Sequence, residues 1–75
     1  MRLQKYIETM RENVKYGMSQ HRANDQINGF IDAMDGMEFK EYRQIQMDLI
    51  GDELTDPRQA RARLQGFQDY IQGGQ

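Results

Sequence analysis

Apolar side chains recur at helical spacing along the whole chain, and this periodicity limits its possible folds more than any other feature. Leu3, Ile7, Met10 and Val14 follow one another at steps of four, three and four residues. Such steps place the four side chains on one face of an α-helix. No alternation of apolar and polar residues is long enough to predict a strand. The sequence predicts an all-α fold, a small bundle of three or four short helices.

A second apolar stripe follows at the same spacing, made up of Ile27, Phe30, Ile31 and Met34. If one straight helix carried both stripes, they would face nearly opposite directions. We therefore expect a bend between Gly17 and Asp25, with Ser19 as a helix cap or break. The alternative is a continuous helix whose second face contacts another subunit.

Two more helices are expected in the second half. The third has Phe39, Tyr42, Gln46, Leu49 and Ile50 on one face, and Gly51 is expected to end it as a C-terminal cap. The last helix has the clearest start: Asp56 as N-cap, Pro57 at the first position and Gln59 completing a capping box. Its expected core face is Ala60, Leu64, Phe67 and Ile71.

Length and composition narrow the functional classes. The chain has 75 residues, of which 37% are apolar, so we expect one domain, 1–75, with a thin core. It has no Cys and one His, which excludes disulfides, thiolate chemistry and paired-His metal sites. Small domains without such links rely on self-association or a partner. The amphipathic N-terminus does not read as a signal peptide, and no apolar run could span a bilayer. We expect a cytoplasmic protein with no membrane partner.

No segment predicts a metal, cofactor or catalytic site. The run from Asn24 to Asp35 resembles the twelve-residue calcium loop of EF-hand proteins, with Gly in the sixth position. It lacks the first and third acidic ligands and the final Glu, so Asn24 or Asp25 is expected to cap a helix instead. His21 lies in a polar turn with no partner for acid–base work. No repeat of the length that signals a solenoid is apparent. We expect that the protein binds no cofactor and is not an enzyme.

Surface residues of interface type carry the functional prediction. Six Met are present, and Met residues mark adaptable binding surfaces. Tyr and Arg are enriched at binding hot spots. The predicted interface has apolar and polar contacts: Tyr6, Tyr16, Met18, Met37, Tyr42, Arg58 and Arg61. Met47 could join Tyr16, Met18 and Met37 in one apolar patch. We expect an interaction module that binds a larger protein or forms a homo-oligomer.

Nucleic acid is the alternative partner. Arginine and glutamine read base edges in the major groove, and the last helix has five such residues on its polar side: Arg58, Arg61, Gln65, Gln68 and Gln72. Three acids, Asp52, Glu53 and Asp56, precede that helix and would repel phosphates. The net charge of −2 adds no general attraction.

The second half resembles short uncharacterised proteins of tailed bacteriophages. The resemblance is carried by Phe39-Lys40-Glu41-Tyr42-Arg43, by Gly51 and by Leu64-Gln65-Gly66. The last two pieces are further apart here, because Asp52 to Gln59 intervenes. The resemblance implies a phage-encoded accessory or inhibitor protein acting in the host cytoplasm, and it carries over no site residues.

Overall fold

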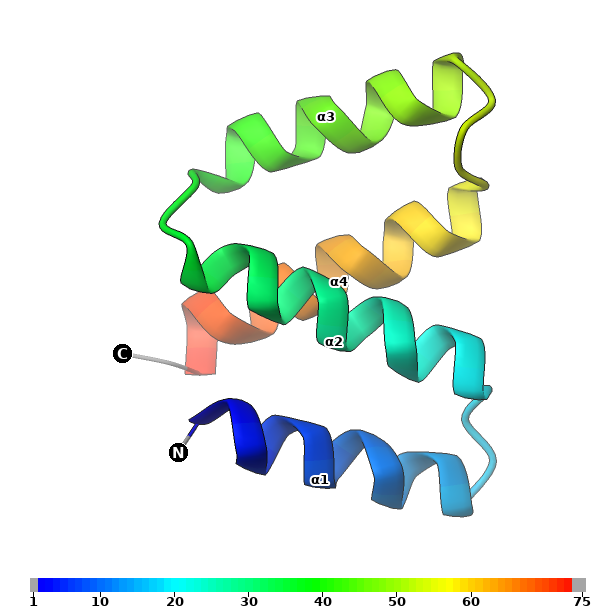
Figure 1. Ribbon diagram of the computed structural model, residues 1–75, viewed down its shortest axis with the longest axis vertical. Helices are drawn as coiled ribbons and strands as arrows, with labels where there is room; N and C mark the ends of the chain where they lie inside the picture. The colour runs from blue at the N-terminus through cyan, green and yellow to red at the C-terminus, as the bar shows by residue number, and fades with distance from the viewer. Residues whose placement is uncertain (1, 74–75) are drawn as a thin grey trace.

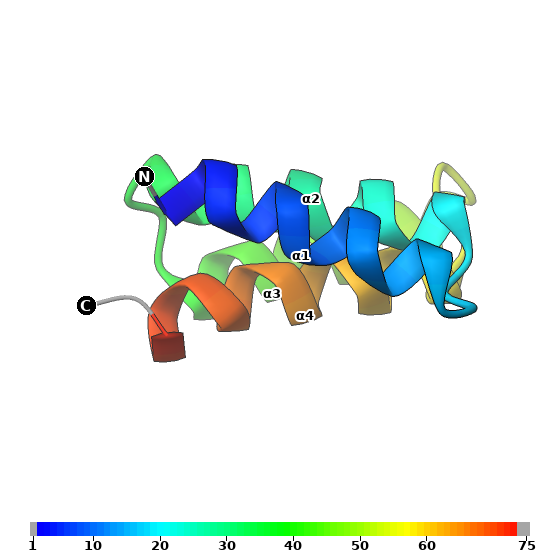
Figure 2. The same cartoon turned by 90° about the horizontal axis from the view of Figure 1, so that it is seen from below.

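The computed structural model describes residues 2–73, which form four α-helices: α1 (Arg2–Lys15), α2 (Gln20–Met34), α3 (Phe39–Gly51) and α4 (Pro57–Gly73). The expected all-α bundle is confirmed. The helices pair as two hairpins, α1 with α2 and α3 with α4 (Figure 1). The hairpins lie in two layers that meet mainly where α2 crosses α4 (Figure 2). None of the helices in residues 2–73 has the length and apolar character needed to cross a membrane.

The chain bends where the opposed stripes required it. α1 ends at Lys15, a turn follows, and α2 begins at Gln20 with Ser19 as its N-cap. The Ser19 hydroxyl accepts a hydrogen bond from the Arg22 backbone N–H at 3.1 Å. The predicted bend is therefore confirmed, and the alternative of one continuous helix is wrong. Asn24 and Asp25 lie inside α2, so neither caps a helix, and the helical backbone excludes a calcium loop there.

The start of α4 is confirmed, and α3 ends at Gly51 as expected, but the predicted capping role of Gly51 is wrong. Asp56 Oδ1 accepts from the Arg58 N–H at 2.7 Å, and the Asp56 N–H donates to Gln59 Oε1 at 3.1 Å. Gly51 does not cap α3, because it is the last helical residue. The residue with positive φ is Glu53, at 60°. Glu53 occupies the place after α3 that Gly17 occupies after α1.

Small residues let α2 and α4 approach at their crossing. A methyl group added at Gly29 would overlap the carbonyl oxygen of Arg63, and one added at Gly66 would overlap that of Gln26. Ala23 and Ala60 are also buried. The predicted faces of α2 and α4 are therefore partly wrong: Phe30 is buried, but Ile31 and Met34 keep 39% and 45% of their surface exposed, and Ile71 on α4 keeps 40%. Large side chains do not fit where two backbones touch.

The two hairpins repeat each other in sequence and in contacts. Ala23, Gly29, Phe30 and Asp32 of α2 recur at the same spacing on α4 as Ala60, Gly66, Phe67 and Asp69. The expectation that no repeat of solenoid length is present is therefore wrong: the spacing from Ala23 to Ala60 is within that range, but the repeat has only two recognisable copies, and they share few residues.

The aromatic contacts follow the same repeat. Tyr6 of α1 stacks on Phe30 with ring centroids 4.1 Å apart, and Tyr42 of α3 stacks on Phe67 at 4.5 Å. Each tyrosine also donates to the opposite hairpin: Tyr6 to Asp69 and Tyr42 to Asp32, both at 2.7 Å. The fold is a pseudo-symmetric pair of helical hairpins.

Candidate interaction groove

A groove of about 880 Å³ opens between the N-terminal halves of α2 and α4. After their crossing, the start of α2 and the start of α4 diverge toward the same side of the molecule (Figure 1). The groove is lined by Ser19, His21, Arg22, Asp25 and Gln26 from the α2 side, and by Asp56, Arg58, Gln59, Arg61, Ala62 and Gln65 from the α4 side. Four pairs of these are equivalent in the repeat: Ser19 with Asp56, His21 with Arg58, Arg22 with Gln59, and Asp25 with Ala62.

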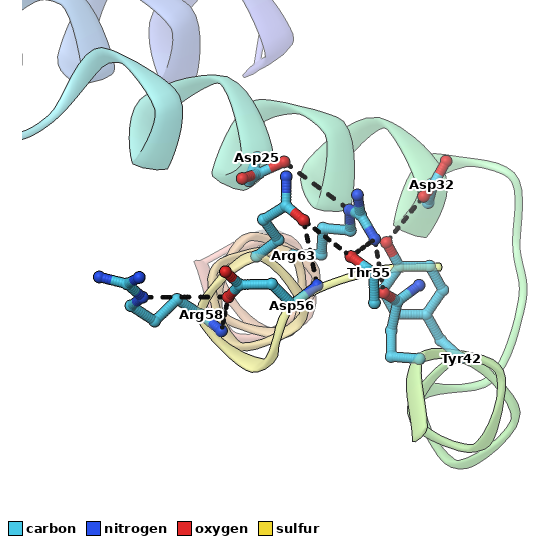
Figure 3. Close-up of polar contacts among 9 residues, drawn as sticks. Asp25, Asp32, Tyr42, Thr55, Asp56, Arg58 and Arg63 are labelled. Carbon is cyan, nitrogen blue, oxygen red and sulfur yellow. Dashed lines mark hydrogen bonds and ion pairs between the residues drawn. The ribbon is translucent and has the colours of Figure 1, made fainter. Parts of the chain in front are cut away.

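A closed polar network centred on Arg63 lies beside the groove and shares Asp25 with its lining. Arg63 Nη1 donates to Gln46 Oε1 and to Thr55 Oγ1, both at 3.0 Å, and its Nε lies 3.7 Å from Asp25 Oδ1 (Figure 3). Asp25 and Gln46 are buried. In residues 2–73, no buried side-chain polar atom lacks a hydrogen-bond partner. Arg63 therefore compensates the Asp25 charge and links α2, α3 and the loop before α4, and it is a structural residue.

The rim of the groove is cationic. Arg22, Arg58 and Arg61 are exposed, and within residues 2–73 neither Arg22 nor Arg61 has an ion-pair partner. The Arg58 Nε lies 3.9 Å from Asp56 Oδ1 (Figure 3), but its side chain is 89% exposed. Water screens so long and exposed an ion pair, so it leaves the guanidinium available. The starts of α2 and α4 add the positive ends of two helix dipoles.

The tyrosines of the core are neutral hydrogen-bond donors. Burial raises the pKa of Tyr42 well above its ordinary value, and the hydrogen bond to the Asp32 carboxylate raises it further. Burial and Asp69 raise the pKa of Tyr6 in the same way. Ionising either phenol would create a second negative charge beside a carboxylate, in a place where water cannot solvate it well. Both side chains therefore serve as links between the hairpins near neutral pH.

The structure separates the predicted interface residues. Arg58 and Arg61 lie together on the groove, and Tyr16 is exposed on the turn before α2. Tyr42 is wrong as an interface residue: only 3% of it is exposed, because it packs on Phe67 in the core. Tyr6 is half-buried and engaged by Asp69 and Gln26.

The predicted methionine patch is also wrong. Met18 is half-buried in the turn between α1 and α2. Met37 lies in the turn between α2 and α3, at the opposite end of α2 (Figure 1), and Met47 lies on α3. The fold therefore distributes over separate elements the apolar residues that the sequence suggested as one surface.

Sequence reasoning missed the α2 side of the groove. The pattern did not place Arg22 on a helix, because the bend was expected somewhere between Gly17 and Asp25, whereas the chain is helical from Gln20 onward. The recurrence of Gly-Phe-x-Asp at Gly29 and Gly66 was the available signal, since it aligns α2 with α4.

A smaller hollow of about 270 Å³ borders α1, but its Asp69 already accepts hydrogen bonds from Tyr6 and Gln65.

Comparison of the chain with protein-family models, with curated proteins and with solved structures finds no match. The groove therefore has to be interpreted from its own residues.

Proposed function

We propose that the protein is an interaction module that binds an acidic segment of a larger protein in the groove between α2 and α4. The observation that supports this most is the set of three exposed arginines, Arg22, Arg58 and Arg61, around one groove in a chain of net charge −2. Arginine presents a planar fork of donors that matches carboxylates. An acidic segment would satisfy those donors and meet two helix N-termini.

A protein partner fits the surroundings of the groove better than nucleic acid does. Asp52, Glu53 and Asp56 lie in the loop before α4, close to where a phosphate backbone would follow the arginines of that helix. A nucleic acid has a phosphate at every nucleotide and cannot avoid these acids. A protein segment can place its acidic residues selectively. Occlusion or scaffolding of the partner would suit the phage accessory role that the resemblance implies.

The test is fluorescence anisotropy with a labelled oligoglutamate peptide. Arg22, Arg58 and Arg61 are replaced together by Gln, and the matched control replaces Arg11, Lys40 and Arg43, which are also exposed but do not line the groove. Both variants lose the same charge. We expect the groove variant to weaken binding about tenfold or more and the control about twofold at most, because exposed distant charges are screened.

Two further probes make the outcome decisive. A labelled oligolysine peptide should not bind, and a labelled DNA duplex should bind more weakly than oligoglutamate at equal salt. Equal loss in both variants would mean that binding follows net charge alone, which contradicts a groove. Tighter binding of the duplex, lost in the groove variant, would favour the nucleic-acid alternative. Light scattering at high concentration tests self-association separately.

A further inference from the structure

We propose that the segment bound in the groove is acidic in its middle and apolar at both ends, with the ends packed against Tyr16 and Leu54. This inference rests on the proposed function and adds to it the residue pattern of the partner. It follows from three features of the two turns beside the groove: their exposed apolar side chains, their backbone hydrogen bonds and their unequal charge.

Tyr16 and Leu54 are the large apolar side chains that the fold exposes most. They are 82% and 72% exposed, whereas the other exposed large apolar residues in 2–73 lie between 38% and 49%. Tyr16 lies in the turn that leads into α2, and Leu54 in the loop that leads into α4 (Figure 1). These segments continue directly into Ser19 and Asp56, which line the groove. The turn that carries Tyr16 and the loop that carries Leu54 therefore border the two walls of the groove.

Both turns are held by the same backbone hydrogen bond. The Met18 N–H donates to the Asn13 carbonyl at 2.9 Å, and the Leu54 N–H donates to the Leu49 carbonyl at 2.9 Å. A turn fixed in this way holds the backbone that carries the exposed side chain before the partner arrives. Binding then costs less conformational entropy than it would on a loop without such bonds. Tyr16 and Leu54 are thus suited to act as anchors.

The charge of the two turns is opposite, although their backbones are equivalent. Residues 15–22 contain Lys15, His21 and Arg22 and no acid. The other turn places Asp52 and Glu53 directly before Leu54. An acidic segment is attracted to the first turn and repelled by the second. The end of the partner that contacts Leu54 is therefore apolar or basic, and its acidic part extends from the groove toward Tyr16.

The experiment compares labelled peptides on the full chain. One peptide contains only glutamates, one has a leucine at each end, and two more have a lysine beside one or the other terminal leucine. We expect the leucine-ended peptide to bind about tenfold more tightly than oligoglutamate, since burying a leucine contributes enough for such a gain. Tyr16→Ser and Leu54→Ser should each reduce that gain. The matched control is Met47→Ser, which alters an exposed apolar residue on α3 away from the groove.

The lysine peptides test the direction of binding. One of them should bind more tightly than the other, and Asp52→Lys with Glu53→Lys should remove that difference. Equal affinity for the glutamate and leucine-ended peptides overturns the inference, and so does an equal loss in Met47→Ser and Tyr16→Ser. Either result leaves the proposed function standing if oligoglutamate still requires the groove arginines. If oligoglutamate binds equally well without the groove arginines, that result instead contradicts the proposed function.

Discussion

Glu53 adopts a left-handed backbone conformation, with φ at 60°, where the equivalent residue after α1 is Gly17 at 118°. A side chain in this region is crowded by its own backbone, at a cost of about 1 kcal/mol. The fold accepts this cost because the Leu54 N–H must reach the Leu49 carbonyl to close α3. We expect Glu53→Gly to raise the free energy of unfolding by about 0.5–1 kcal/mol, measured by urea denaturation. Gly17→Ala is the opposite control and should lower it, and a loss of stability in Glu53→Gly would contradict the argument.

At the scale of the elements, the crossing of α2 and α4 depends on two glycines. Alanine at Gly29 or Gly66 would overlap a backbone carbonyl of the other helix, which cannot move aside as a side chain can. We expect either substitution to lower the free energy of unfolding by about 3 kcal/mol, despite the better helix propensity of alanine. Gly51→Ala is the matched control, because a methyl group there meets nothing within 4 Å. Thermal denaturation measures all three, and equal effects would show that crowding is unimportant.

At the scale of the whole molecule, each hairpin is bonded to the other through a tyrosine. Tyr42→Phe would leave the Asp32 carboxylate without its phenol donor, and we expect a loss of about 1–3 kcal/mol. Tyr6→Phe should cost less, because Asp69 keeps its hydrogen bond from Gln65 at 2.8 Å. Urea denaturation of the two variants measures the difference. A larger loss of unfolding free energy in Tyr6→Phe than in Tyr42→Phe would contradict the argument that Gln65 compensates Asp69.

The same tyrosines set the response of the whole fold to alkaline pH. Their pKa values are raised in the folded chain, so the folded state keeps the phenol protons more tightly than the unfolded state. The contribution of these tyrosines to the free energy of unfolding is therefore fully present below the ordinary tyrosine pKa of about 10. It decreases as the pH rises above that value. Denaturation at several pH values should show this fall, and a variant with both Tyr6→Phe and Tyr42→Phe should show a smaller one.

The sequence by itself determined the elements of this protein. Helical spacing, the Ser19 cap and the Asp56–Gln59 capping box act within a few residues, so they could be recognised without the fold. Arg58 and Arg61 could be predicted to lie together for the same reason, since they share one face of one helix.

Only the tertiary structure decided which faces are buried and where the groove lies. Tyr42 is in the core, and Arg22 faces Arg58 and Arg61 across one groove. Both facts follow from how closely α2 passes α4 at Gly29 and Gly66. That contact joins residues far apart in the chain, and its geometry depends on backbone packing that no local pattern contains.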